Sequence, residues 1–269
     1  MVVKPESTIG TKGAIQTLKE YYIASVSWGK DSLYMLLRLL EEGAPLNEVA
    51  FYDTGMEFQA IYNTRDAILP LLKEHGVKYT EFKPKRPFEY DMLEKPVKSK
   101  NGDHLGYSWC GGSARWGTAG KQKTLDAHAK KYSDQGYIVF QYVGIAADEP
   151  KRIKKLAAQK IAPLAEWGAT EADCLQGCYN RGYEWIENGF RLYDLLDRVS
   201  CWCCANKNLK ELKNIYTYLP DYWERLKGLQ RRMDRPMKGK GKSVFDLEER
   251  FSEEMEQEKA QISLSELWG

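Results

Sequence analysis

The sequence predicts an α/β protein built on a parallel β-sheet. Three stretches, 21–26, 49–58 and 137–152, begin with apolar and aromatic residues that are typical of a strand. Each leads into a polar turn, with a glycine either in the turn or shortly before it. Helical spacing of apolar residues follows the first of them, at Leu33, Leu36, Leu37 and Leu40. Strands that alternate with helices favour a parallel sheet, whose ligand crevice lies beyond the carboxyl ends of its strands. We therefore expect all three turns to face one site.

The first turn carries most of the chemical information. Its sequence from Ser25 to Ser32 is S-V-S-W-G-K-D-S, and it leads into a helix predicted over 33–42 that Gly43 ends. Free backbone N–H groups, the positive end of the helix dipole, Lys30 and the hydroxyls would meet at one point, which suits a phosphate. The loop is not a Walker A motif, because Asp31 follows the lysine. An ordinary strand-to-helix turn with a solvated lysine is the alternative.

This loop resembles the PP-loop, S-G-G-K-D-S, of the adenine nucleotide alpha-hydrolase superfamily. Trp28 stands where the first glycine would be, and we expect it to bind through its backbone N–H at negative φ. With D-T-G-x-E at 53–57 and V-G-I-x-A-D-E-x-x-R at 143–152, the chain resembles the phosphoadenosine phosphosulfate (PAPS) reductase family over about 20–205. The resemblance implies a Rossmann-like parallel sheet with a cysteine-rich metal segment, followed by a helical C-terminal extension.

The resemblance also implies a nucleotide-binding set. The phosphates would be held by Ser25, Ser27, Trp28, Gly29, Lys30, Asp31 and Ser32, with Gly144 beside them, while Asp53, Thr54 and Glu57 would line the adenosine side and Arg152 would reach an anionic group. Lys30 and Asp31 are the catalytic candidates in this loop, and Mg²⁺ would accompany the nucleotide. Two simpler roles stay open: Asp53 could cap the next helix, and Arg152 could lie on a solvated basic face.

The cysteines are the second source of chemistry. Five of the six, Cys174, Cys178, Cys201, Cys203 and Cys204, fall between 174 and 204. A cytosolic location disfavours a disulfide framework, which leaves a metal as the natural alternative. Thr170 and Asp173 predict a capping box, so that Cys174 and Cys178 lie one helical turn apart. Thiolates at these spacings suit Zn²⁺ or a [4Fe–4S] cluster.

Our preferred metal ligands are Cys178, Cys201, Cys203 and Cys204, with Cys110 as a substitute for one of them. Cluster-containing members of the family carry a cysteine pair near the place of Cys110, which implies a related role for it. Cys174 is expected to be a buried thiol. A set of six reduced core cysteines remains the alternative, because free cysteine is often buried.

The reaction follows from what the chain lacks. PAPS reductases attack sulfur with a cysteine in a C-terminal E-C-G-[IL]-H segment, whereas no cysteine follows Cys204 here. We therefore expect an enzyme that splits ATP into AMP and pyrophosphate to activate an acceptor for sulfur transfer. A sulfonucleotide reductase acting on PAPS or APS, with Cys110 as a non-standard nucleophile, is the second hypothesis. A nucleotide-binding protein without catalysis is the third.

Composition indicates the kind of partner and the cellular location to expect. The 40 basic and 38 acidic residues of this 269-residue chain nearly cancel, so no global field indicates nucleic acid. No apolar run approaches a membrane span and no signal-peptide core is present, so we expect a cytoplasmic protein without a membrane partner. The sulfur donor, the acceptor and the oligomeric state stay open, and a homo-oligomer is one option.

Two domains are expected. Residues 1–206 would form the nucleotide-binding domain, including the cysteine-rich segment 174–204, and 207–269 would form a helical cap. Within that cap, Tyr222 and Trp223 are expected to be packing residues. The segment 231–242 holds six basic residues and reads as a mobile loop, with phosphate or RNA contact as the alternative.

Overall fold

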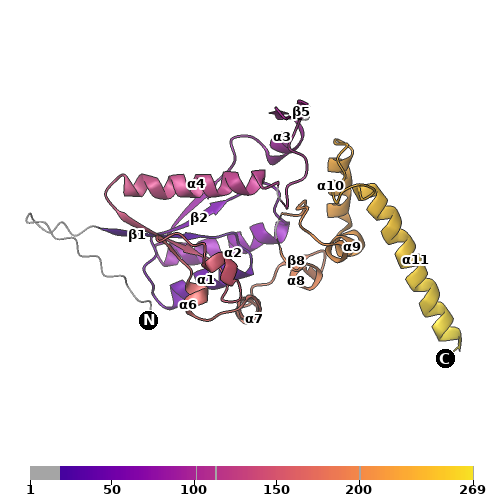
Figure 1. The fold of residues 1–269 in the computed structure, drawn as a ribbon. Helices are drawn as coiled ribbons and strands as arrows, with labels where there is room; N and C mark the ends of the chain where they lie inside the picture. The colour runs from indigo at the N-terminus through magenta and orange to yellow at the C-terminus, as the bar shows by residue number, and fades with distance from the viewer. Residues whose placement is uncertain (1–18, 101, 113, 200, 269) are drawn as a thin grey trace, which may run out of the picture. The chain divides into compact units, whose positions relative to one another are not determined.

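The computed structural model describes residues 19–100, 102–112, 114–199 and 201–268 (Figure 1). This part of the chain forms two compact units, each assembled from separate stretches of sequence. The sheet unit comprises 19–53, Gln59–Lys83 and Gly120–Glu184, and the cysteine unit comprises Thr54–Phe58, Pro84–Ala119 and 185–268. No helix within the described ranges is long and apolar enough to cross a membrane.

This division differs from the boundary predicted near residue 206. Residues 185–206 join the C-terminal helices, and so do two earlier stretches of the chain. Backbone hydrogen bonds explain the difference: Trp202 N donates to Met56 O at 3.0 Å, and Ala205 N donates to Cys110 O at 3.0 Å. Contacts between segments so far apart in sequence leave no local signal in the residues themselves.

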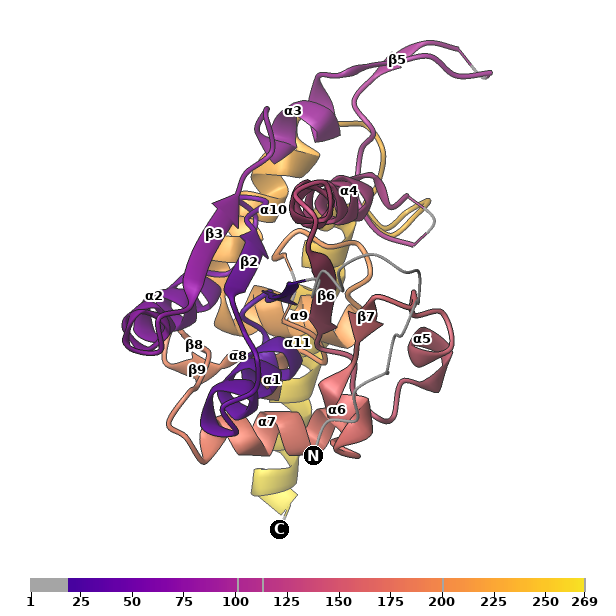
Figure 2. The ribbon, with the colours of Figure 1, turned by 90° about the vertical axis from the view of Figure 1, so that its left-hand side faces the viewer.

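The sheet unit is built on a five-stranded parallel sheet with the order β3-β2-β1-β6-β7 (Figure 2). The strands are β1 (Glu20–Ser25), β2 (Glu48–Tyr52), β3 (Lys78–Phe82), β6 (Ile138–Val143) and β7 (Lys160–Ile161). The chain moves outward from β1 to β3 and then returns to the other side of β1 with β6. The strand order therefore reverses between β1 and β6, and open α/β sheets bind ligands beyond the carboxyl ends at such a point.

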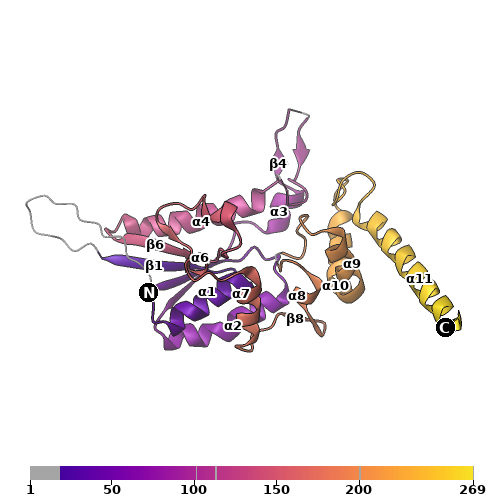
Figure 3. The same ribbon diagram turned by 60° about the horizontal axis from the view of Figure 1, so that its bottom comes forward.

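Helices cover both faces of this sheet. On one face lie α1 (Lys30–Glu41) and α2 (Gln59–Glu74), and on the other lies α4 (Trp116–Ser133) (Figure 1). The four leucines that predicted the first helix are all buried. The short α5 (Pro150–Ile153) and α6 (Pro163–Glu166) follow β6, and α7 (Glu171–Tyr179) packs against α1 (Figure 3).

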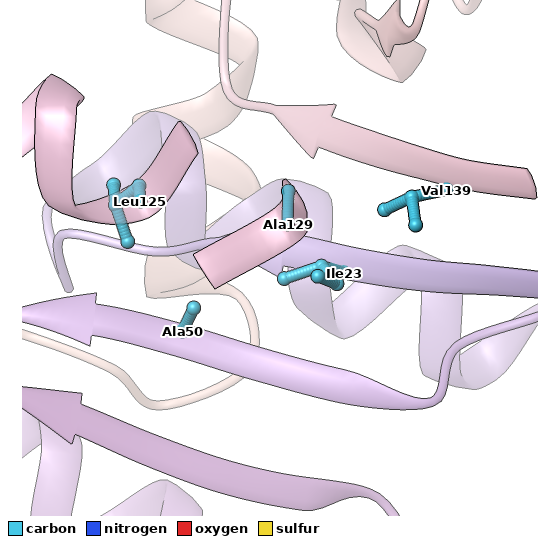
Figure 4. Close-up of a cluster of buried hydrophobic side chains, with 5 residues drawn as sticks. All are labelled: Ile23, Ala50, Leu125, Ala129 and Val139. Atoms are coloured by element: carbon cyan, nitrogen blue, oxygen red, sulfur yellow. The ribbon is translucent and has the colours of Figure 1, made fainter. Parts of the chain in front are cut away.

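Under α4, five apolar side chains form a continuous core layer with the sheet. Leu125 and Ala129 of α4 meet Ile23 of β1, Ala50 of β2 and Val139 of β6, all of them buried (Figure 4). The layer links the three strands whose ends carry the sequence motifs. It fixes those ends relative to one another, because close-packed side chains leave little room for movement.

The cysteine unit is mainly helical. Its elements are α3 (Phe88–Leu93), the hairpins β4 (Pro96–Val97) with β5 (His104–Leu105) and β8 (Ile186–Glu187) with β9 (Phe190–Arg191), then α8 (Leu192–Leu195), α9 (Leu209–Tyr218), α10 (Pro220–Gln230) and α11 (Val244–Trp268). An Asn208–Glu211 capping box starts α9, and a proline at the first helical position starts α10. Tyr222 and Trp223 are buried, which confirms their packing role.

Candidate nucleotide site and cysteine group

The loop after β1 is held closed by Ser32. Its hydroxyl donates to Gly29 O at 3.1 Å and accepts from Ser27 N at 3.1 Å. Helix α1 begins at Lys30, three residues earlier than the sequence predicted, so Lys30 lies in its first turn. Ser25 ends β1, half-buried, directly before this loop. The free N–H groups of a helix start are thus presented beside the loop, as anion binding requires.

Trp28 departs from the sequence prediction in an informative way. Its φ is +62°, not negative, so the residue adopts the left-handed conformation that a glycine would take at this position. This conformation disfavours a side chain by about 1–2 kcal/mol. The indole is 0% exposed and packs on the rings of Phe51 and Tyr79, with centroids 6.1 and 6.0 Å away. Burying about 150–250 Å² at about 25 cal/mol per Å² stabilises the loop by more than that strain.

Lys30 is enclosed by carboxylates. Its Nζ lies 2.7 Å from Asp31 Oδ1 and 2.7 Å from Glu171 Oε2, and its side chain is only 7% exposed. Burial opposes the charge, yet the two carboxylates outweigh it and raise the pKa of Lys30. Burial raises the pKa of Asp31 despite the lysine, and the charges of Glu171 and Glu149 add to that rise. The site without nucleotide therefore holds more negative than positive groups.

Gly144 shows that the first and third motifs meet. A Cβ placed on Gly144 would lie 2.9 Å from both Cα and N of Ser32, so only glycine allows the end of β6 to approach the start of α1 this closely. Next in the same motif, Asp148 accepts from the N–H of Glu171 at 3.2 Å. This contact holds the start of α7, and with it the carboxylate that reaches Lys30.

Glu171 is the residue that sequence reasoning missed. The predicted capping box of Thr170 and Asp173 is confirmed and places Glu171 in the first turn of α7. That much could be read from the sequence. Its pairing with Lys30, however, joins positions 141 residues apart.

The second motif is divided between the two units. Asp53 is buried in the sheet unit, where Tyr62 OH donates to its Oδ1 at 2.7 Å and Lys83 Nζ lies 3.7 Å from Oδ2. It does not precede the next helix directly, because α2 begins at Gln59. Thr54 and Glu57 belong to the cysteine unit, where the Thr54 hydroxyl donates to Glu57 Oε1 at 3.1 Å.

Arg152 lies on the surface of the sheet unit. Its guanidinium is about half exposed and pairs with Glu149, which stands just before α5. Glu149 is also one of the charges that act on Asp31. The arginine is thus linked to the Lys30 site through its partner.

The cysteines separate into two groups. Cys174 and Cys178 lie on α7 in the sheet unit, both buried, and the Cys178 thiol donates to Lys30 O at 3.5 Å. Burial raises the pKa of Cys178 to about 12. The other four, Cys110, Cys201, Cys203 and Cys204, belong to the cysteine unit. All six lie within the described residues as thiols, none of them in a disulfide.

Within the cysteine unit the four thiols come from neighbouring loops. Cys204 N donates to Cys201 O at 3.1 Å, and the loop of Cys110 bonds to Ala205. The thiols of Cys203 and Cys204 are hydrogen-bond partners of the Cys201 thiol, and the bond from Cys203 contributes most to raising the pKa of Cys201. In the described part of the chain, no three His, Cys, Asp or Glu side chains are spaced as ligands of one metal ion.

Comparisons with known proteins give two likenesses. No family model matches the chain. An uncharacterized protein of Methanocaldococcus jannaschii, MJ0066, is 25% identical over 237 residues, which cover 82% of this chain and 43% of the relative. The chain thus spans less than half the length of that relative.

The second likeness is structural. The U34-tRNA thiolase NcsA from Methanococcus maripaludis, solved with its [4Fe–4S] cluster, is 13% identical, with a TM-score of 0.42 over 90% of this chain and 75% of that one. At this score the likeness carries no conclusion about this chain. The predicted fold class rests on the strands themselves: the parallel α/β sheet, the loop after β1 and the helical C-terminus are confirmed.

Proposed function

We propose that this chain is a PP-loop enzyme related to PAPS reductases, which binds ATP at the start of α1 and splits it into AMP and pyrophosphate to activate an acceptor for sulfur transfer. The observation that carries the proposal is the position of Lys30. It is a nearly buried cation in the first turn of α1, beside the switch point between β1 and β6. A cation, a helix start and a close glycine at one place suit a polyphosphate.

The carboxylates around Lys30 define how the nucleotide would enter. Phosphate oxygens would replace Glu171 as partners of the ammonium group. Asp31, Glu149 and Glu171 together exceed the charge of Lys30, so a nucleotide carrying Mg²⁺ fits better than a bare polyanion. Mg²⁺ prefers oxygen ligands and commonly takes one or two carboxylates beside phosphates, which matches the side chains present.

The proposed reaction is balanced in two steps. An acceptor oxygen attacks the α-phosphorus, and the bond to the β-phosphate breaks as pyrophosphate leaves with the electron pair. The acceptor carbon that bears this oxygen is thereby activated. A sulfur donor at the oxidation level of hydrosulfide then attacks that carbon, and AMP leaves with the oxygen. The N–H groups of the α1 start and Lys30 would stabilise the charge that develops on pyrophosphate, which is where such donors lower a barrier.

For the cysteine group we propose Cys110, Cys201, Cys203 and Cys204 as the ligand set. Cys178, in our first preference, has its thiol buried on α7 against Lys30 O, whereas Cys110 is tied by its backbone to the segment that carries the other three. Four thiols match the donor type of a [4Fe–4S] cluster or of Zn²⁺, and because no three of them are spaced as ligands of one ion in the described residues, metal binding would draw these side chains closer together. Such a centre would supply a place where inorganic sulfur is held.

The deciding experiment measures nucleotide products. Purified protein is incubated with Mg²⁺–ATP and candidate acceptors, and AMP and pyrophosphate are quantified beside Lys30→Ala. Formation of both products by the wild type, absent in the variant, supports the proposal. Sulfite released from PAPS or APS, and lost in Cys110→Ser, would instead establish a sulfonucleotide reductase. Tight nucleotide binding with neither product would establish a binding protein.

A further inference from the structure

The basic segment 231–242 is fixed in place, contrary to the mobile loop predicted from its composition. Trp109 Nε1 donates to Arg235 O at 2.9 Å, and Gln230 Nε2 donates to Met233 O at 3.0 Å. Lys238 Nζ donates to the carbonyls of Ala205 and Lys207, both at 2.8 Å. Every one of these contacts lies within the cysteine unit.

The anchors connect this segment to the cysteine group. Trp109 immediately precedes Cys110, and Ala205 immediately follows Cys204. The backbone of 231–242 is therefore held against the two loops that carry the four thiols. Whatever binds to the exposed side of the segment is placed near those thiols.

Some basic side chains of the segment are engaged in contacts within the protein, and others are exposed. Lys238 serves as an anchor, and Arg232 pairs with Glu89 and Glu94 at 3.0 Å each. Arg235, Lys240 and Lys242 are exposed and form no ion pair with any residue that the structure describes. Three cations on a fixed backbone attract a polyanion with little loss of backbone entropy.

An exposed aromatic ring follows this segment and lies beside Arg231. Phe245, in the first turn of α11, is 39% exposed, and the Arg231 guanidinium lies 5.7 Å from the centre of its ring. An exposed ring next to basic side chains is the combination that binds single-stranded nucleic acid, because bases stack on rings while phosphates meet cations. Basic side chains beside a phenylalanine also suit an anionic lipid surface, and competition with lipid vesicles distinguishes that case.

We propose that segment 231–242 with Phe245 binds a single-stranded nucleic acid, and that this nucleic acid is the acceptor of the reaction. The first half stands on the surface alone, and the second half rests on the proposed function. The chemistry recognised is the phosphodiester backbone plus an unpaired base, which RNA and DNA share.

The test measures binding of fluorescent single-stranded RNA and DNA of about 20 nucleotides by anisotropy over a range of KCl concentrations. The triple variant Arg235→Ala, Lys240→Ala, Lys242→Ala should bind at least about tenfold more weakly at low salt. Its slope of log affinity against log salt should be smaller by about 2, since each single-strand phosphate contact contributes about 0.7. Phe245→Ala should weaken binding without changing that slope.

A matched control removes three exposed lysines from helices of the sheet unit: Lys73→Ala, Lys123→Ala, Lys131→Ala. It carries the same charge change and should bind as the wild type does. Equal losses in both triple variants would show a general charge effect and overturn the proposal. The same outcome follows if phosphatidylserine vesicles or poly-glutamate compete as well as the oligonucleotides, or if no oligonucleotide binds.

Binding of RNA alone or of DNA alone supports the proposal and identifies the sugar, and equal binding of both supports it through the backbone and bases that they share. Lys30→Ala should keep full oligonucleotide binding, because Lys30 belongs to the sheet unit. Wild-type protein that binds the oligonucleotides but forms no AMP and pyrophosphate from ATP would therefore count against the proposed function, and with it the acceptor role, but not against the nucleic-acid surface. Circular dichroism of each variant confirms that the fold is kept.

Discussion

The ammonium group of Lys30 and the carboxylate of Glu171 lie 2.7 Å apart, although 141 residues separate them in sequence. In this pair the first turn of α7 supplies the counterion to the first turn of α1. The carboxylate of Glu171 thus occupies the position beside Lys30 that a bound phosphate would take. A nucleotide bound as proposed would have to compete with Glu171 for Lys30.

Glu171→Gln should make nucleotide binding less dependent on Mg²⁺. Removing one negative charge beside Lys30 lowers the repulsion that a bare polyphosphate meets, and a charge-assisted contact contributes about 1.5–3 kcal/mol. We expect affinity for ATP in EDTA to rise at least about fivefold, measured by calorimetry, while Lys30→Ala lowers it at least about tenfold. Glu74→Gln, on an exposed carboxylate of α2 in the same unit, is the control. Unchanged affinity in Glu171→Gln would show that the pair does not compete with phosphate.

Gly144→Ala should impair nucleotide binding while Gly228→Ala should not. The Cβ added at 144 would lie 2.9 Å from the backbone of Ser32. The clash can be relieved only if the end of β6 or the loop before α1 moves. A Cβ at 228 in α10 meets nothing within 4 Å and should stabilise the helix by about 0.5–1 kcal/mol. Melting temperatures and ATP affinities of the two variants, compared side by side, decide the point. Wild-type affinity in Gly144→Ala would contradict the packed site.

The metal content should depend on the cysteine unit alone. Protein purified without oxygen should contain iron with acid-labile sulfide, or one zinc, and Cys201→Ser with Cys204→Ser should remove it. Cys174→Ala should retain the metal, because that thiol is buried on α7 in the other unit. Elemental analysis and the visible absorption spectrum are the readouts. Metal absent from fresh wild-type protein would leave the six cysteines as thiols of the core.

Stability in acid should depend on Glu48. This carboxylate is fully buried on β2, with Tyr132 OH at 2.7 Å, Tyr21 OH at 3.0 Å and His128 Nε2 at 2.9 Å, while Lys78 lies 3.5 Å away. Burial would raise its pKa, yet the hydrogen bonds from Thr80 and Tyr132 and the charge of His128 outweigh burial and lower it. A lowered pKa stabilises the folded state above the ordinary glutamate value, about 4.3, and this contribution disappears as pH falls through the folded value.

Urea unfolding at a series of pH values tests this. The free energy of unfolding of the wild type should fall below about pH 4.5 more steeply than that of Glu48→Gln. At neutral pH the variant should be less stable by about 1.5–3 kcal/mol, the contribution of hydrogen bonds to a charged group. Parallel pH curves for the two proteins would exclude the assignment. Glu42→Gln, on an exposed carboxylate, is the control.

The sequence predicted what is local. The strand before Ser27, the helix after Lys30 and the Thr170 cap depend on neighbouring residues, and the structure contains all three. The prediction of a negative φ at Trp28 was wrong. The sign of this angle depends on a pocket that Phe51 of β2 and Tyr79 of β3 form around the indole. The placement of Cys201, Cys203 and Cys204 with residues 54–58 and with the stretch 84–119, which carries Cys110, depends on hydrogen bonds across long separations, and spacing along the chain does not encode these.

The alternation of the two units along the chain also sets an order of assembly during synthesis. The sheet unit has all its segments once residue 184 has been made, whereas Phe58, which is fully buried, packs on Tyr222 at 4.7 Å between ring centres. At about 5–20 residues per second, that ring waits about 10–30 s for its partner. Over this interval the growing chain presents apolar side chains that the finished protein hides. A C-terminal truncation before α10 would make that exposure permanent, so we expect such fragments to aggregate or to be degraded.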